Sequence, residues 1–174
     1  MAENAFTLVI GGPVDVDRVI NALFERGCDD ATVGSVDGVG YADFHRDAPS
    51  QADAIFSAIK DVEAVQGLRV LRVEPDDLVT LSDIAQRLGR TRESVRLLAA
   101  GERGGGEFPA PVSHLRSRNR LWRWSDVAAW ADAKGGQELE QAQLLAAINA
   151  ALELRNRSAT LPRRERERVE ALAR

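Results

Sequence analysis

The chain has 174 residues, 44% of them hydrophobic and 29% charged, with a formal net charge of −4. These proportions are typical of a soluble globular protein, and no apolar run approaches the ~18 residues that a membrane-spanning helix requires. The N-terminus lacks a basic segment followed by a long apolar core, so no signal peptide is expected. The single cysteine, Cys28, excludes an internal disulfide and suits a cytoplasmic protein.

Charge is unevenly distributed along the chain. Residues 1–78 hold 6 Lys and Arg against 15 Asp and Glu, which gives −9, whereas residues 79–134 hold 10 against 6, which gives +4. Residues 135–174 hold 7 against 6 and carry +1. A basic segment beside an acidic one is the pattern expected of a nucleic-acid-binding module joined to a domain that does not bind nucleic acid.

Residues 1–75 are predicted to form a small domain of four strands and two helices. Runs of β-formers alternate with amphipathic segments, and Asp37-Gly38 is typical of a tight hairpin between the middle strands. The expected strands are 6–10, 31–36, 39–44 and 68–73. The inner faces of the helices are expected to comprise Val16, Val19, Ile20, Leu23 and Phe24 in the first and Ile55, Phe56, Ile59, Val62 and Val65 in the second.

The order strand, helix, strand, strand, helix, strand is that of the ferredoxin-like fold, in which both helices cover one face of an antiparallel sheet. ACT domains that sense small molecules and RRM domains that bind RNA share this order. RNA binding is disfavoured because Tyr41 and Phe44 lie in an acidic stretch. The domain is expected to end at Glu74-Pro75-Asp76-Asp77, since Pro75 disfavours a helix at Glu74 and cannot donate to a ladder.

Residues 78–134 are predicted to fold separately. Apolar residues recur at helical spacing on both sides of Gly89, which indicates two short helices joined by a tight turn. Two short strands, 112–115 and 121–124, are expected around a basic turn in which Asn119 adopts a positive φ, and a third helix is expected from Ser125. At least two of Trp122, Trp124 and Trp130 are expected in the core. This is the element order of a winged helix-turn-helix.

Three motifs in this segment follow one another as LSDIAQRLGRTRESVRLL, FPAPV and RLWRWSDVAAW. Together they resemble the winged DNA-binding domain of the MerR/excisionase superfamily, including its AlpA-like phage regulators, over residues 78–133. The resemblance implies that the second helix enters the major groove and that the wing touches an adjacent backbone or minor groove. The chain departs from the family pattern at residues 103–106, which lengthen the connection before the second motif.

Eight residues are predicted to contact DNA. Thr91 is expected to cap the second helix with its hydroxyl, Arg92 and Arg96 to donate to guanine, and Glu93 to accept from cytosine N4. The remaining cations are expected to meet phosphates: Arg90 in the turn, and Arg116, Arg118 and Arg120 in the wing. The alternative is that the helix arginines are solvated or pair with Glu93, and that the wing is a solubilising loop.

Residues 137–174 are predicted to be helical. The segment from Gln137 to Arg155 is rich in helix formers, and Leu161-Pro162 begins a charged final helix. An apolar stripe on the first of these helices favours packing against its own domain or against a second copy. The stripe comprises Leu144, Leu145, Ile148, Ala151 and Leu152.

No residue set is typical of catalysis or metal binding, so no enzymatic activity, cofactor or metal is expected. His45 and His114 are far apart in the sequence, and no cysteine cluster accompanies them. Gly11-Gly12-Pro13 lacks the Gly-Lys-Ser/Thr ending of a phosphate-binding loop. Cys28, with Arg26 as its basic neighbour in sequence, is expected to be a structural thiol.

The sequence therefore predicts sequence-specific binding of double-stranded DNA by a bacterial or phage-type transcriptional regulator located at the nucleoid. One such module contacts few bases, so a homodimer or larger oligomer is expected, formed through the helix of residues 137–155, the N-terminal sheet or both. Two alternatives remain open. One is an antitoxin or recombination-accessory adaptor whose residues 1–75 bind a protein, and the other is an ACT-like sensor of a small molecule.

Overall fold

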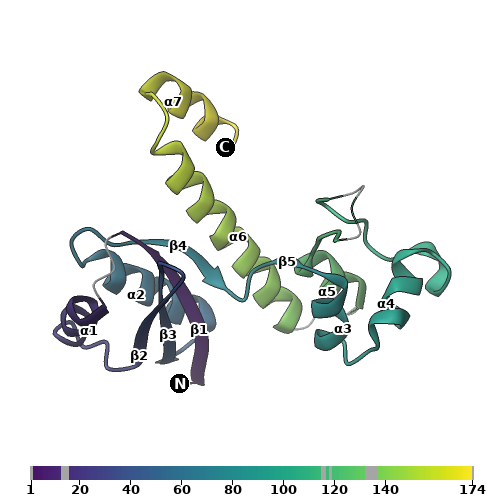
Figure 1. Cartoon of the computed structure of the whole chain (residues 1–174), viewed down its shortest axis with the longest axis horizontal. Coiled ribbons are helices and arrows are strands. Elements are labelled where there is room, and N and C mark those ends of the chain that lie inside the picture. Colours follow the sequence, from purple (N-terminus) through teal and green to yellow (C-terminus); the bar gives the residue numbers. More distant parts are fainter. Residues whose placement is uncertain (1, 13–15, 115–116, 118, 132–136, 174) are drawn as a thin grey trace. The chain divides into compact units, whose positions relative to one another are not determined.

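The computed structural model describes residues 2–12, 16–114, 117, 119–131 and 137–173. It confirms a mixed α+β structure. The chain divides into two compact units, Met1–Pro75 with Ala147–Arg174 and Asp76–Ala146, and helix α6 (Gln137–Ser158) contributes to both (Figure 1). Within the described ranges, none of the helices has both the length and the apolar character needed to cross a bilayer.

The first unit is built on a four-stranded antiparallel sheet in the order β2-β3-β1-β4. Its outer strands are β2 and β4, and the hairpin at Asp37-Gly38 joins β2 to β3. The elements of the unit are β1 (Ala2–Gly11), α1 (Val16–Phe24), β2 (Ala31–Val36), β3 (Val39–Ala48), α2 (Gln51–Glu63), β4 (Arg69–Glu74), the second half of α6, and α7 (Arg163–Ala171).

Alternation along β3 sets the buried face of this sheet. Every second residue from Gly40 to Ala48 is buried, and Phe44 stacks on Phe6 of β1 with ring centroids 5.5 Å apart. Helix α2 packs on this face, and it begins after Ser50 because the Ser50 hydroxyl accepts a hydrogen bond from the backbone N–H of Asp53. The strand is longer than expected, so the same alternation also carries Arg46 to the buried side.

Three apolar residues that were expected on the inner helix faces are exposed instead. Ile20 and Phe24 of α1 are 43% and 68% exposed, and Phe56 of α2 is 54% exposed. A helix lying on a flat sheet buries a narrow row, and each of these residues follows a buried one, about 100° further round the helix. The rows that are buried are Val19 and Leu23 in α1, and Ile55, Ala58 and Val62 in α2.

The apolar stripe of α6 is largely covered within the chain itself. Leu145, Ile148 and Leu152 are all buried, whereas Ala151, which was predicted to belong to the stripe, is exposed. At the C-terminal end of α6, Arg166 donates to the carbonyl oxygens of Ser158, Ala159 and Leu161 at 3.1–3.2 Å. This guanidinium satisfies carbonyls that have no partner inside the helix.

The second unit has a small sheet and three short helices before α6. Its core contains Trp122, which is fully buried, and Trp124, which is 7% exposed, so the prediction that at least two tryptophans are core residues is confirmed. Its elements are β5 (Leu78–Val79), α3 (Leu81–Arg87), α4 (Arg92–Ala99), the 3-10 turn η1 (Gly104–Gly106), β6 (Trp122–Arg123) and α5 (Trp124–Ala131).

The strand pairing in this unit differs from the predicted hairpin. β6 pairs with β5, and in the described part of the expected partner segment Leu121 forms an isolated bridge with Ser113. Trp124 was predicted to end a strand but begins α5, because the backbone carbonyl of Asp77 accepts from its N–H. His114, just before the expected turn, has a positive φ of 54°. Leu115 lies outside the described residues.

Asp77 organises this corner of the second unit. Its carboxylate accepts from the backbone N–H of Ser125 at 2.8 Å and from Arg123 at 3.0 Å, and the side chain is only 3% exposed. A residue that the sequence placed in an acidic linker is therefore the cap of α5, since it satisfies an amide in the first turn of that helix.

Candidate nucleic-acid interface

The two helices before and after Gly89 are fixed by capping interactions at the turn. Gly89 has φ 60°, and the following Arg90 N–H donates to the Ala85 carbonyl at 2.8 Å, which closes the end of α3. One residue later, the Thr91 hydroxyl accepts from the Ser94 N–H at 3.1 Å and starts α4. The predicted capping role of Thr91 is therefore confirmed. These caps hold the first turn of α4 in a defined place.

Helix α3 begins with a reciprocal cap that makes stability depend on pH. Asp83 accepts from the Thr80 N–H at 2.8 Å and from its hydroxyl at 2.7 Å, and these bonds, the backbone one first, hold the pKa of Asp83 below its usual range. A depressed folded pKa stabilises the protein above the unfolded pKa, and this contribution is lost as pH falls through the folded value. We expect Asp83→Asn to cost about 1 kcal/mol at pH 7 and much less below about pH 3.

The stability cost of Asp83→Asn is measured by urea unfolding at the two pH values, with unfolding monitored by amide exchange in residues 76–146. Glu107→Gln is the matched control, because Glu107 is an exposed carboxylate of the same unit. An equal cost of Asp83→Asn at both pH values would contradict the assignment of the cap to the ionised carboxylate.

The outer face of α4 carries the predicted base-reading arginines. Arg92 is exposed and has no ion pair among the described residues. Arg96 is also solvent-facing, at 45% side-chain exposure, but its Nε lies 3.0 Å from both carboxylate oxygens of Glu93 and its Nη1 lies 3.5 Å from Glu102. The pairing of Arg96 with Glu93, weighed as the alternative above, is thus present, and it lowers the pKa of Glu93.

Three arginines of this unit each lie over a tryptophan ring. Arg87 is centred 4.9 Å from the Trp124 ring, Arg90 lies 6.0 Å from the Trp130 ring, and Arg120 lies 5.8 Å from the Trp122 ring. Stacking restrains a guanidinium plane while leaving its N–H edge able to donate. None of the three makes an ion pair with a described residue. Arg116 and Arg118, the other two predicted wing cations, lie outside the described residues.

The FPAPV motif fastens the segment between α4 and β6 to the same tryptophans. The indole N–H of Trp122 donates to the Pro109 carbonyl at 3.0 Å. Phe108 meets the Trp130 ring edge-on, with centroids 4.9 Å apart. The buried indole N–H of Trp122 thus has a hydrogen-bond partner. The tryptophans that lie beneath Arg90 and Arg120 also hold the segment that leads to the predicted wing.

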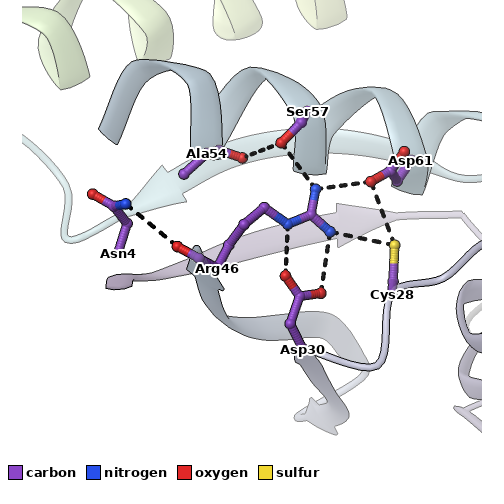
Figure 2. Close-up of polar contacts among 7 residues, drawn as sticks. All are labelled: Asn4, Cys28, Asp30, Arg46, Ala54, Ser57 and Asp61. Carbon is purple, nitrogen blue, oxygen red and sulfur yellow. Dashed lines mark hydrogen bonds and ion pairs between the residues drawn. The ribbon is translucent and has the colours of Figure 1, made fainter. Parts of the chain in front are cut away.

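A second polar cluster lies in the first unit around Arg46 (Figure 2). Arg46 donates to both carboxylate oxygens of Asp30 at 2.7 and 3.1 Å, to Asp61 at 2.8 Å and to the Ser57 hydroxyl at 3.0 Å. It also donates to the sulfur of Cys28 at 3.4 Å and lies over the Phe44 ring, 4.9 Å from the ring centroid. Every nitrogen of the guanidinium is engaged, so the cluster ties together the end of the α1 turn, β3 and α2.

A depression of about 440 Å³ lies beside this cluster. Its walls are mainly carboxylates, and the guanidinium of Arg46 is already bonded, so it offers no open cation to an anionic ligand. The neighbouring Cys28 thiol is buried, and this burial raises its pKa, which keeps it protonated and unreactive. The residues lining the depression are Gly27, Asp29, Asp30, His45, Arg46, Asp47 and Asp61.

Sequence reasoning missed three of these residues. Arg46 was overlooked because the third strand was ended at Phe44, although continuing the alternation by two residues would have placed it inside. Arg87 was overlooked because its ring partner is 37 residues away, beyond the reach of any periodicity. Cys28 was assigned Arg26 as its basic neighbour, whereas Arg46 is the one within contact distance.

The predicted DNA-contacting residues that the structure describes come from the turn before α4, from α4 itself and from the segment entering β6. Thr91 caps α4, and Arg96 and Glu93 form an ion pair with each other. Arg90, Arg92 and Arg120 form no ion pair with a described residue. No protein-family model, curated protein or solved structure matches the chain.

Proposed function

We propose that residues 76–146 bind double-stranded DNA as a winged helix-turn-helix, in a transcriptional regulator of bacterial or phage type that acts as a dimer or larger oligomer. Helix α4 would enter the major groove with Arg92 leading. The segment from Ser113 to Leu121 would form the wing, and Arg90 and Arg120 would bind flanking phosphates. The first unit would be a ferredoxin-like domain, a proposal that its strand order β2-β3-β1-β4 supports, and it would supply assembly or partner contacts.

The observation that carries this proposal is a set of arginines on a rigid support, of which Arg87, Arg90 and Arg92 are exposed and Arg120 is half-buried. Arg87, Arg90 and Arg120 rest on tryptophan rings, and Arg92 stands on the first turn of a capped helix. A cation that makes no ion pair within the protein is free to neutralise a phosphate, and a polyanion that binds several of them gains free energy from the release of counterions. The charge of +4 over residues 79–134, within a chain of net −4, agrees with a polyanionic partner for this segment alone.

The base-reading role narrows to Arg92. Arg96 forms ion pairs with Glu93 and Glu102, so its Nε, Nη1 and Nη2 groups already have carboxylate partners. Arg92 keeps its full guanidinium for guanine O6 and N7, a contact that discriminates by about 1–3 kcal/mol. We therefore expect Arg92→Ala to reduce discrimination between the preferred duplex and a scrambled one by about 5- to 150-fold.

The measurement is fluorescence anisotropy with a duplex selected from a random pool and with its scrambled counterpart. Arg164→Ala is the matched control, because Arg164 is an exposed arginine of α7 outside the proposed interface. If Arg92→Ala leaves the ratio of the two affinities unchanged, Arg92 does not read bases and the proposed docking of α4 is wrong.

A further inference from the structure

The four-stranded sheet has two outer edges, and one of them is closed by side chains of α6 and of the last residue of α2. At β4, the Oδ1 of Asn149 accepts from the Val73 N–H at 2.7 Å, and its Nδ2 donates to the Val73 carbonyl at 2.8 Å. One side-chain amide thus reproduces both bonds that a neighbouring strand would make to this residue. Val70 is the next residue of β4 whose backbone groups point away from β1, and side chains bond to these groups as well.

Val70 has both of its backbone groups satisfied from outside the sheet. Its N–H donates to Glu63 at 3.0 Å, and its carbonyl accepts from Arg155 at 3.1 Å and from Asn156 at 3.0 Å. The outer edge of β4 is therefore unavailable to a further strand. Sealing an edge with side chains is one way in which proteins prevent unwanted strand pairing.

The opposite edge, β2, has no such closure among the described residues. The N–H of His45 donates to the carbonyl of Asp30, and the register pairs Thr32 with Asp43 and Gly34 with Tyr41. Because hydrogen-bonded pairs alternate along an antiparallel ladder, the intervening residues direct their backbone groups away from β3. These outward residues are Ala31, Val33 and Ser35, and no described residue is bonded to their backbone groups on that side.

The sequence of β2 also lacks the features that protect an edge. Its six residues, ATVGSV, contain no charge and no proline and include three β-branched side chains. Helix α1 contacts β2, and it leaves Ile20 and Phe24 exposed at 43% and 68%. Backbone groups along a strand, with apolar side chains on an adjacent helix, are what strand addition by an extended peptide uses.

Charge at the two ends of β2 selects the occupant. Asp29 precedes the strand and Asp37 follows it, and both are exposed. Two copies of β2 paired about their Val33 residues would place Ala31 opposite Ser35 and Asp29 opposite Asp37, so like charges would meet at both ends. A second copy is disfavoured for this reason, whereas a strand with a Lys or Arg at each end would meet both carboxylates.

We propose that β2 is the docking edge for an extended basic segment of another protein, which adds to the sheet as a fifth strand. The acidic character of this part of the chain, −9 over residues 1–78, agrees with such a partner. The inference does not depend on DNA binding, because it concerns a different unit of the chain. It assigns a specific surface, the outer edge of β2, to the alternative in which residues 1–75 bind a protein.

The test uses the full chain and a fluorescein-labelled probe peptide of alternating Thr and Val with a Lys at each end. Amide exchange by NMR is expected to show protection on peptide addition at Ala31, Val33 and Ser35, while Thr32 and Gly34 are already protected by β3. Ser35→Pro removes one outward donor without touching the ladder, and we expect it to weaken peptide binding by about 2- to 10-fold in anisotropy. Asp29→Asn with Asp37→Asn is expected to weaken it at low salt only.

Several outcomes would overturn the proposal. No change in exchange on peptide addition would do so, as would protection elsewhere in the chain. So would equal binding of a peptide with Glu at each end. Protection of the same three amides without peptide, together with a doubled mass in light scattering, would assign the edge to a second copy instead. DNA binding by the same sample is measured separately, so a failure here leaves the proposed function standing.

Discussion

Replacing Arg46 with alanine is expected to lower the free energy of unfolding of the first unit by about 3–5 kcal/mol. The guanidinium is 11% exposed, and it is the cation for two partly buried carboxylates, those of Asp30 and Asp61. Removing it leaves both without a counter-charge and leaves the Ser57 hydroxyl without its donor. The loss therefore reflects stranded charge more than the net strength of the original contacts.

Urea unfolding with amide exchange read over residues 1–75 and 147–174 measures this loss. Arg157→Ala is the matched control, since its i,i+4 pair with Glu153 is 81% and 64% exposed and is expected to contribute at most about 0.5 kcal/mol. Arg46→Lys is expected to recover only part of the stability, because one ammonium cannot satisfy both carboxylates in this geometry. Equal effects of Arg46→Ala and Arg157→Ala would show that the cluster is not a structural tie.

Replacing Trp122 with alanine is expected to destabilise the second unit by about 3–5 kcal/mol. The side chain is fully buried, contributes to the core under α3, α4 and α5, and donates its indole N–H to Pro109. Its removal leaves a cavity that the surrounding side chains fill only in part, releases the FPAPV segment from its hydrogen bond, and takes away the ring beneath Arg120. DNA affinity is expected to fall with stability, while the first unit stays folded.

Amide exchange resolved for the two units separates these effects. Phe24→Ala is the control for aromatic truncation, because Phe24 is 68% exposed and its loss is expected to change stability by no more than about 0.5 kcal/mol. Trp122→Phe is expected to retain most of the packing and to lose about 1 kcal/mol with the indole hydrogen bond. Should Trp122→Ala unfold the first unit as readily as the second, the two units would not be independently stable.

The element types were largely predictable because hydrophobic periodicity and local capping are properties of short segments. Thr91 was recognised as a cap from its neighbours alone, and it makes the expected bond. The positive φ that a tight Asp37-Gly38 turn requires is present at both residues.

What the sequence did not disclose depends on partners far along the chain. Strand β6 pairs with β5, more than forty residues earlier, and the carboxylate that caps α5 is Asp77, which sequence reasoning had assigned to a linker. The exposure of Phe24 follows from the narrow row that a helix buries on a flat sheet, which periodicity alone does not measure. The closure of β4 by Asn149 is of the same kind, because the sequence does not indicate which distant backbone group a polar helix residue will bond.

The central claim is that the second unit binds a polyanion through its unpaired arginines, and salt titration of DNA binding by the full chain tests it most directly. With a duplex selected from a random pool, we expect saturable binding whose logarithmic affinity falls linearly with the logarithm of salt concentration, and a slope that decreases by about 0.9 for each of Arg90→Ala and Arg120→Ala. Failure to bind any duplex at low salt, or slopes identical in the wild type and both variants, would contradict the account.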